Sequence, residues 1–251
     1  MSGLILRLAA PLQSWGEHSA FSLRDTQRFP TRSGLIGMFA SAHGLRRGEP
    51  LTEFDSLHLS VRIDRPGAVI TDFHTIGGGH TPADTVKTAA GSRRTAGKGT
   101  IVTRRNYLSD AVFTVGVAGP HETLSRLADA LAAPHWQPYL GRRSCPPEQP
   151  LLLRTDVHDP LHDLKYTVPI HGAQRATIDL VTETPGQDDE GHDRDSTITE
   201  LLDVPETFEP QQRRYRSRSV TVTPFTKSPN ELWHKEINEF YTALFRYMGV
   251  S

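Results

Sequence analysis

Hydrophobic and polar residues alternate most regularly between Leu57 and Asp64, where every second residue is apolar. Such alternation predicts a β-strand with one buried face and one exposed face. Short apolar runs predict four further strands, at residues 4–9, 68–75, 111–118 and 151–154. The turn signal Arg65-Pro66-Gly67 separates two of these strands and predicts a sharp reversal of the chain.

Two segments between these strands repeat apolar residues at helical spacing. The first helix is expected to begin at Pro30-Thr31-Arg32-Ser33-Gly34, because Pro and a Thr or Ser cap are typical entry signals, and to end at Gly44. The second is expected to begin at Pro120 and to bury a face that includes Leu124 and Leu131. The resulting order is β-α-β-β-α-β, which predicts an α+β, ferredoxin-like domain of the kind found in RNA-recognition modules. Both helices would then cover one sheet face and leave the other free for a ligand such as RNA.

An inserted hairpin at about 76–108 interrupts this order. We therefore expect a ferredoxin-like domain over residues 1–155, with residues 156–251 forming a smaller, β-rich C-terminal region that ends in a helix. Within that region the patterns predict loops at 157–163 and 184–196, a strand with alternating basic residues at 213–222, and an amphipathic helix at 230–248. The helix is expected to pack on the chain's own body, with docking to a partner protein as the alternative.

Composition limits the class of protein. The chain has 251 residues, of which 36% are hydrophobic, enough for one compact body with at most a small appendage. It contains no apolar run of about 18 residues, which predicts no membrane span, and its start lacks the layout of a signal peptide. A single cysteine, Cys145, excludes an internal disulfide framework and a cysteine-rich zinc site. We expect a cytoplasmic protein without a cofactor.

The total charge is close to zero, with 28 basic and 29 acidic residues, which at first argues against a nucleic-acid partner. The charges are unevenly distributed, however. The segment from Thr85 to Tyr107 holds six cations and no acid, whereas the segment from Thr182 to Glu209 holds ten acids and one cation. Because a phosphate backbone responds to the local field, the basic segment is a candidate nucleic-acid contact despite the neutral total. The acidic segment is expected to be a solvated loop.

Enzyme signatures are weak in this sequence. The run that ends in Lys98-Gly99 resembles a phosphate-binding loop, but it lacks the required first glycine and the Ser or Thr after lysine. His158 and His162 are four residues apart, yet the intervening Pro160 disfavours a shared helical face, so we expect no metal site. Cys145 is expected to be a small buried residue.

The most unusual stretch is Tyr139-Leu140-Gly141-Arg142-Arg143-Ser144-Cys145-Pro146. Adjacent side chains of an extended chain point to opposite sides, so one arginine can reach a phosphate while the other pairs internally. A surface loop with two salt bridges is the alternative.

Five sequence blocks occur together in a characteristic order. They are Leu6 to Gly16, Arg28 to Gly37, Asp72-Phe73-His74-Thr75, Tyr107 to Val115, and Tyr139 to Pro146. In this combination they resemble the CasD family, whose members are subunits of Cascade, the CRISPR RNA-guided surveillance complex of type I-E systems. The resemblance covers roughly residues 4–155, and the insertion at about 76–108 corresponds to the family's thumb hairpin.

The resemblance implies a non-catalytic, RNA-binding scaffold. Members of the family hold the 5′ handle of the CRISPR RNA and cap one end of the complex, with a ferredoxin-like domain of the repeat-associated type. The thumb is expected to contact the backbone subunit CasC and the large subunit CasA. Target DNA would be reached only indirectly, through the complex, and no membrane is involved.

Sixteen residues are expected to contact RNA. Those at the start of the first helix, where backbone N–H groups favour phosphate, are Thr31, Arg32 and Ser33. The cations of the thumb are Arg93, Arg94, Lys98, Arg104 and Arg105. The remaining polar candidates are Arg28, Arg142, Arg143 and Ser144, and the residues expected to stack on bases are Trp15, Phe73, His74 and Tyr107.

Two other functions stay open at this point. A related branch of the family cleaves RNA, so a metal-independent endoribonuclease with His74 and Tyr107 as acid–base groups is the main alternative. A protein–protein adaptor that does not bind RNA is the third.

Overall fold

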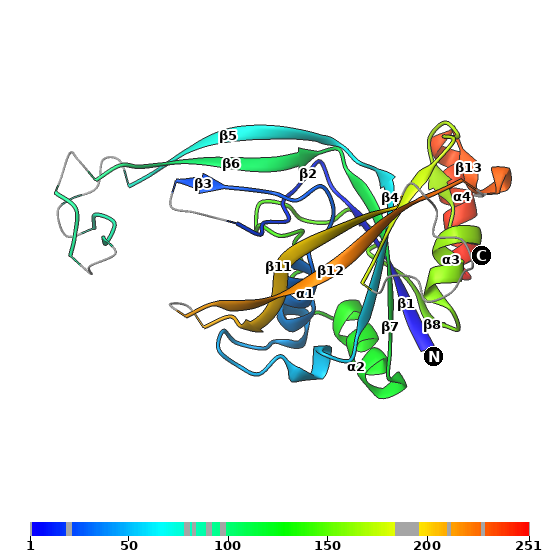
Figure 1. The fold of residues 1–251 in the computed structure, drawn as a ribbon, viewed down its shortest axis with the longest axis horizontal. Coiled ribbons are helices and arrows are strands. Elements are labelled where there is room, and N and C mark those ends of the chain that lie inside the picture. The colour runs from blue at the N-terminus through cyan, green and yellow to red at the C-terminus, as the bar shows by residue number, and fades with distance from the viewer. Residues whose placement is uncertain are drawn as a thin grey trace.

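Four strands from the first 157 residues form one end of the main sheet (Figure 1). They are β1 (Ser2–Ala9), β4 (His58–Arg65), β7 (Val112–Gly119) and β8 (Leu152–Val157). They lie in the order β4-β7-β1-β8 with every neighbouring pair antiparallel. Helix α1 (Arg32–His43) lies between β1 and β4 in the chain, and α2 (His121–Ala132) lies between β7 and β8. The α+β class and the β-α-β-β-α-β order are therefore confirmed.

The computed structural model describes most of the chain. The described residues are 2–18, 22–77, 81, 84–88, 92–95, 99–183, 196–209, 212–226 and 229–250. The predicted loop at 184–196 thus lies almost entirely outside the described residues.

Helix α1 begins and ends at the residues that the sequence predicts. The hydroxyl of Thr31 accepts a hydrogen bond from the Gly34 N–H at 3.3 Å, which caps the first turn. Gly44 ends the helix with φ of +79°, a left-handed conformation that favours glycine.

A second, smaller sheet carries the protruding part of the molecule. Its long strands are β5 (Ala68–Ile76) and β6 (Ile101–Ser109), which pair along their whole length. Two short strands, β2 (Leu12–Gln13) and β3 (Leu23–Arg24), pair with β6 on its other edge. Figure 1 shows β5 and β6 extending as a ribbon well beyond the body. We call these two strands, with the segment that joins them, the thumb.

The C-terminal part of the chain extends the main sheet. Three strands continue it beyond β4, in the order β4-β10-β12-β11. Their bounds are β10 (Ile178–Thr182), β11 (Thr197–Thr207) and β12 (Arg214–Phe225). The predicted basic strand at 213–222 is confirmed as β12, and strands from both predicted regions pair in one sheet.

The sheet face opposite α1 and α2 is covered, which contradicts the expectation of a free face. Helices α3 (Pro160–Tyr166) and α4 (Ile237–Met248) lie on it (Figure 1). Ile5 of β1 belongs to a buried cluster with Leu164 of α3 and Phe240 of α4. The RNA-recognition mode that uses this face is therefore closed by the chain's own C-terminal residues.

Helix α3 approaches the sheet closely at a glycine. A Cβ atom on Gly3 would lie 1.9 Å from Cγ of Pro160, far inside van der Waals contact. A Cβ atom on a second glycine, Gly116 of the neighbouring strand β7, would lie 3.0 Å from Cβ of Pro160. The absence of side chains at these two positions is what lets the helix seat on the sheet.

Two predictions for the C-terminal region are wrong. The expected loop at 157–163 contains the start of α3, because Pro160 occupies the first helical turn, where proline is tolerated, and Asp159 caps the helix. The predicted helix at 230–248 begins only at Ile237. A 3₁₀ turn, Asn230–Leu232, and a short strand, β13 (Trp233–His234), precede it.

The remaining elements are short. They are the 3₁₀ turn Thr52–Phe54 and the strand β9 (Ile170–His171), which pairs with β13 in parallel. Helix α4 itself packs on the chain's own body through Phe240, Leu244 and Tyr247, as the first of the two interpretations predicts.

Candidate RNA interface

The thumb divides the candidate residues between two opposite faces. In the β5–β6 register Asp72 pairs with Arg105, and Phe73 pairs with Arg104. Paired residues point to the same side of a sheet and neighbours along a strand point to opposite sides. Arg105 and Phe73 therefore lie on different faces, which we call the Arg105 face and the Phe73 face.

Strand β3 extends both faces by one residue. Arg24 pairs with Arg105, and Leu23 pairs with Arg104. The Arg105 face thus carries the charged row Arg24, Arg105 and Asp72 across three strands. His74 lies on the same face, with its Nε2 atom 2.5 Å from Oδ2 of Asp72.

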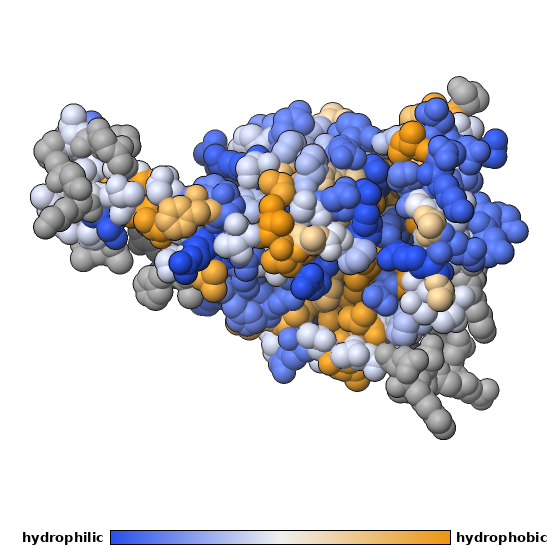
Figure 2. All heavy atoms as spheres, turned by 90° about the horizontal axis from the view of Figure 1, so that it is seen from above, coloured by the Kyte–Doolittle hydropathy of each residue, from blue (hydrophilic) through white to orange (hydrophobic). Residues whose placement is uncertain are grey.

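The Phe73 face is largely apolar. Phe73 is 61% exposed, and the exposed side chains of Leu23, Val69 and Val102 share its face. Figure 2 shows orange patches along the thumb outside the body of the molecule. Arg104 is the cation of this face. Exposed apolar area of this kind is typical of surfaces that bind other proteins.

The loop after α2 is pinned to the base of the thumb. Gly141 has φ of +84°, and a Cβ atom there would lie 1.6 Å from the carbonyl oxygen of Ser14. The Ser14 N–H donates to the Leu140 carbonyl at 3.1 Å. This close approach of two backbone segments fixes where the next residues, Arg142 and Arg143, can reach.

Arg142 is held by the protein itself. Its guanidinium carbon lies 4.4 Å from the centroid of the Tyr107 ring. Its Nη1 donates to the Asn106 carbonyl at 2.8 Å, and its Nη2 lies 3.3 Å from the carbonyl oxygens of both Arg24 and Asp25. Arg142 therefore fastens the loop to β3 and β6.

Arg143 does not share the contacts of Arg142. It is exposed and makes no hydrogen bond or ion pair with the residues that the structure describes. Ser144 beside it is also exposed. The structure therefore separates the two arginines, one paired internally and one exposed. Residues 142–145 nevertheless form a turn, in which the Cys145 N–H donates to the Arg142 carbonyl at 2.9 Å, and not the expected extended chain.

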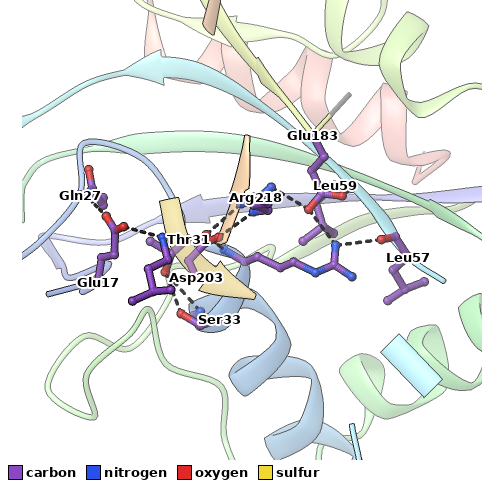
Figure 3. Close-up of polar contacts among 12 residues, drawn as sticks. Glu17, Gln27, Thr31, Ser33, Leu57, Leu59, Glu183, Asp203 and Arg218 are labelled. Carbon is purple, nitrogen blue, oxygen red and sulfur yellow. Dashed lines mark hydrogen bonds and ion pairs between the residues drawn. The ribbon is translucent and has the colours of Figure 1, made fainter. Parts of the chain in front are cut away.

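The N-terminus of α1 already has an anion, and it belongs to the chain. The backbone N–H of Arg32 donates to Oδ2 of Asp203, a completely buried carboxylate, at 2.6 Å (Figure 3). The sequence predicts that a phosphate binds at this helix start, and in the structure the carboxylate of Asp203 from β11 occupies that position. A phosphate has no free position there in this structure.

The Asp203 carboxylate and three further charged side chains form a network. Glu183 Oε1 lies 2.7 Å from Nη1 of Arg32 and 2.8 Å from Nη1 of Arg218. Arg218 also donates to both oxygens of Asp203, at 2.6 and 2.9 Å. We call Arg32, Glu183, Asp203 and Arg218 the Asp203 network. Burial alone would lower the pKa of Arg218, but its hydrogen bonds and charge pairing with Asp203, and the charge of Glu183, outweigh burial and raise that pKa.

Burial removes three candidates from an RNA surface. Trp15 is fully buried, with its Nε1 donating to Gln13 Oε1 at 3.1 Å, so no ring face is open to a base. Thr31 is buried as the helix cap, and Arg32 is 7% exposed with its guanidinium turned to Glu183 and two carbonyls. The expected stacking and phosphate contacts of these side chains are contradicted by this packing. Their role is to position α1.

Tyr107 is also largely enclosed. It is 3% exposed, and Arg142 covers its ring. A nucleobase could reach this ring only by displacing the guanidinium. Ser33 is partly exposed, and its hydroxyl lies 3.4 Å from that of Thr31.

The remaining thumb cations lie beyond the body. Arg93 donates from Nη1 to the Thr85 carbonyl at 2.8 Å, and Arg94 is exposed. Lys98 lies outside the described residues. Arg28, at the other end of the site, is exposed. Sequence reasoning missed Arg24, because β3 is only two residues long and carries no periodic signal.

Other chemistry has little support. Among the described residues no group of three or more His, Cys, Asp or Glu side chains is arranged to hold a metal ion. His158 precedes α3 and His162 lies within it. Cys145 is buried, and burial raises the pKa of its thiol, which disfavours the reactive thiolate. In the described part of the chain, no helix is long and apolar enough to cross a membrane.

Comparisons with known proteins point to one family. Residues 3–221 match the family described as "CRISPR-associated protein (Cas_Cas5)". The chain is 38% identical over 186 residues to the CRISPR system Cascade subunit CasD of Escherichia coli (strain K12), a match that spans 68% of this chain and 79% of that protein.

Two solved structures are similar over nearly the whole chain. A chain of a "CRISPR RNA-guided surveillance complex" matches with a TM-score of 0.86 and 49% identity, covering 98% of this chain and 99% of that one. A structure titled "Crystal structure of Cas protein" matches with a TM-score of 0.61 and 28% identity, covering 93% and 98%. The chain therefore belongs to the Cas5 family of CRISPR-associated proteins and groups with CasD of type I-E Cascade.

Proposed function

We propose that this protein is a non-catalytic subunit that binds the 5′ handle of a CRISPR RNA and caps a Cascade complex. The observation that carries the proposal is the placement of Arg143. It is an exposed cation on a loop that Arg142 fixes against the Arg105 face of the thumb. A rigid loop beside a charged sheet face is suited to hold a short stretch of single-stranded RNA.

The cations of this site can contact successive phosphates. Arg24 and Arg105 are neighbours on adjacent strands, and Arg142, which bonds the backbone of Arg24, directly precedes Arg143 in the loop. Guanidinium groups bind phosphate oxygens in pairs of hydrogen bonds. His74, partly exposed on the same face, is the remaining candidate for stacking on a base.

The Phe73 face is left for protein neighbours. Its apolar side chains are exposed on the side of the sheet opposite Arg105, so both faces can be occupied at once. We assign this face to the neighbouring subunits, CasC and CasA. Target DNA would be reached only through the complex, and the protein would act in the cytoplasm.

The endoribonuclease alternative is weakened by the thumb register. His74 pairs with Thr103, four residues from Tyr107 along β6, which is about 13 Å at roughly 3.3 Å per residue. Tyr107 is buried under Arg142. An acid–base pair must contact the same phosphodiester, and these two side chains are too far apart to do so.

Salt-dependent binding tests the RNA site. The logarithm of affinity falls linearly with the logarithm of salt concentration. Each phosphate contact that is lost should make this negative slope shallower by roughly 0.7 for single-stranded RNA. The double variant Arg105→Ala/Arg143→Ala should therefore make the slope for handle-bearing RNA shallower by about 1.4. The matched control is Arg126→Ala on α2, which pairs with Glu53 away from the thumb. An unchanged slope in the double variant would exclude this site.

Two further measurements separate the alternatives. Incubation with precursor repeat RNA in EDTA should leave the RNA intact, and specific cleavage that His74→Ala abolishes would establish the enzyme instead. The assembled complex should retain RNA, with a high absorbance ratio at 260 and 280 nm. A ratio typical of protein alone would favour the adaptor.

A further inference from the structure

Arg7 is a buried cation without adequate partners. It is 6% exposed and lies on the face of β1 that α3 and α4 cover. Its Nε and Nη1 atoms are buried and have no hydrogen-bond partner among the described residues. The closest carboxylate oxygen, Oε2 of Glu148, is 3.7 Å from Nη2, beyond hydrogen-bond distance, on a side chain that is 48% exposed. Arginine cannot relieve this situation by losing its proton.

A small cavity adjoins this guanidinium. Its volume is about 20 Å³, and its lining residues are Arg7, Asp64, Arg65, Val112, His171 and Phe240. The guanidinium carbon of Arg7 lies 5.6 Å from the centroid of the Phe240 ring. A water molecule needs about 10–15 Å³, so the cavity admits a water or a monatomic ion. A phosphate or sulfate group is too large for it.

The carboxylate that lines the cavity is already neutralised. Oδ1 of Asp64 accepts from Nε of Arg62 at 2.5 Å, and its Oδ2 accepts from the Thr114 hydroxyl at 2.5 Å. Arg62 is itself 1% exposed, so these two opposite charges compensate each other inside the sheet. The exposed Arg65 pairs with Asp110 at 3.0 Å. Among the described residues, Arg7 is thus the buried charge at this cavity that lacks a buried counterion.

We propose that the cavity beside Arg7 binds a single halide ion, chloride under cellular conditions. A buried guanidinium needs hydrogen-bond acceptors and a compensating negative charge. A water molecule would supply a hydrogen-bond acceptor but no charge, whereas an anion supplies both. His171 of β9 can donate a further hydrogen bond from its imidazole. The ion would connect β1 to β9 and α4, because Arg7 belongs to the first and His171 and Phe240 to the others. This proposal is independent of RNA binding.

Anomalous diffraction from crystals of the full chain grown in bromide tests the site directly. Bromide replaces chloride in such sites, and its anomalous peak should lie within about 3.5 Å of a guanidinium nitrogen of Arg7. An ordered water without an anomalous peak at this position would overturn the proposal.

Thermal unfolding provides a test in solution. Replacing gluconate by chloride at constant ionic strength should raise the melting temperature by about 3 °C, because an ion that binds only the folded state stabilises it. Arg7→Met should abolish this rise, whereas the exposed control Arg126→Met should keep it. An equal rise in Arg7→Met would attribute the effect to general salt action and overturn the site.

If Arg7→Met does not fold, the unmodified chain still decides the question. The rise in melting temperature should saturate below about 0.1 M chloride for a specific site, as expected for mass action on one site. A rise that continues linearly with chloride, like a general solvent effect, would contradict the proposal.

Discussion

The carboxylate of Asp203 accepts a hydrogen bond from the backbone N–H of Arg32, a residue 171 positions earlier in the chain. This bond places a buried negative charge at the start of α1, where the helix dipole favours it. It also fastens the β11–β12 hairpin to the first helix of the ferredoxin-like part. The two predicted regions of the chain are thus joined at the helix start as well as through the sheet.

The first prediction concerns this contact. Asp203→Ala should lower the free energy of unfolding by about 3–5 kcal/mol, because Arg218 would keep a buried charge with fewer partners. Urea unfolding measures the change. The control is Glu206→Ala on the same strand, whose ion pairs with Arg214 and Arg216 are exposed, at 3.8 and 3.3 Å. Removing these surface pairs should cost at most about 1 kcal/mol. Equal losses in the two variants would contradict a special role of the Asp203 network.

The second prediction uses two glycines with opposite surroundings. Gly3→Ala should destabilise the protein by about 1–3 kcal/mol or more, because the new methyl group would overlap Pro160. Gly37→Ala in α1 should instead stabilise it by about 0.5–1 kcal/mol, since a Cβ there meets only Phe208 at an ordinary 3.8 Å and alanine favours helix. Chemical unfolding of both variants gives the sign of the change in the free energy of unfolding. Stability unchanged in Gly3→Ala would mean that α3 does not seat on the sheet as described.

The third prediction separates the two arginines of the loop. Arg143→Ala should make the salt slope of RNA binding shallower by roughly 0.7 and leave the melting temperature unchanged. Arg142→Ala should weaken RNA binding and also destabilise the fold by about 1–3 kcal/mol, because its hydrogen bonds and its contact with Tyr107 are lost. Binding titrations and thermal unfolding are compared for both. A stability loss in Arg143→Ala alone would reverse these roles.

The fourth prediction is a pH effect. Burial lowers the pKa of His43, and the nearby charge of Glu53 offsets this only in part. Because the unfolded chain then binds a proton more readily than the folded one, this contribution to stability is fully present above about pH 6.5 and is lost as the pH falls below that value. His43→Leu, packed against Phe54, should flatten the fall in melting temperature between pH 7 and 5. The exposed control His121→Gln should leave the fall in melting temperature unchanged. An equally steep fall in His43→Leu would exclude His43 as the source of this pH dependence.

The central β-α-β-β-α-β order was predictable because its signals are local. Alternation at Leu57 to Asp64 and the cap residues Thr31 and Gly44 each act within a few positions of the elements they define. Helix α3 also carries local signals, since Asp159 is a good cap and Pro160 suits a first turn. We predicted a loop there because we interpreted Pro160 as a helix breaker.

The covered sheet face and the Asp203 network were not predictable in this way. Ile5 and Phe240 are 235 positions apart, and no spacing rule connects them. The same holds for the site. Trp15 and Tyr107 have the side chains expected of stacking residues, and only the packed structure shows that Gln13 and Arg142 occupy their polar edge and ring face.

The covering of the sheet by α3 and α4 has a consequence for the nascent chain. The ribosome adds about 5–20 residues per second, so roughly ten seconds pass between the synthesis of β8 and that of α4. During this interval Ile5 and Leu153 lack the part of their cover that Phe240 and Leu244 of α4 supply. The partly synthesised protein therefore exposes apolar sheet area that the complete chain buries. This face of the sheet closes only once the C-terminal helix α4 has been made and can pack on it.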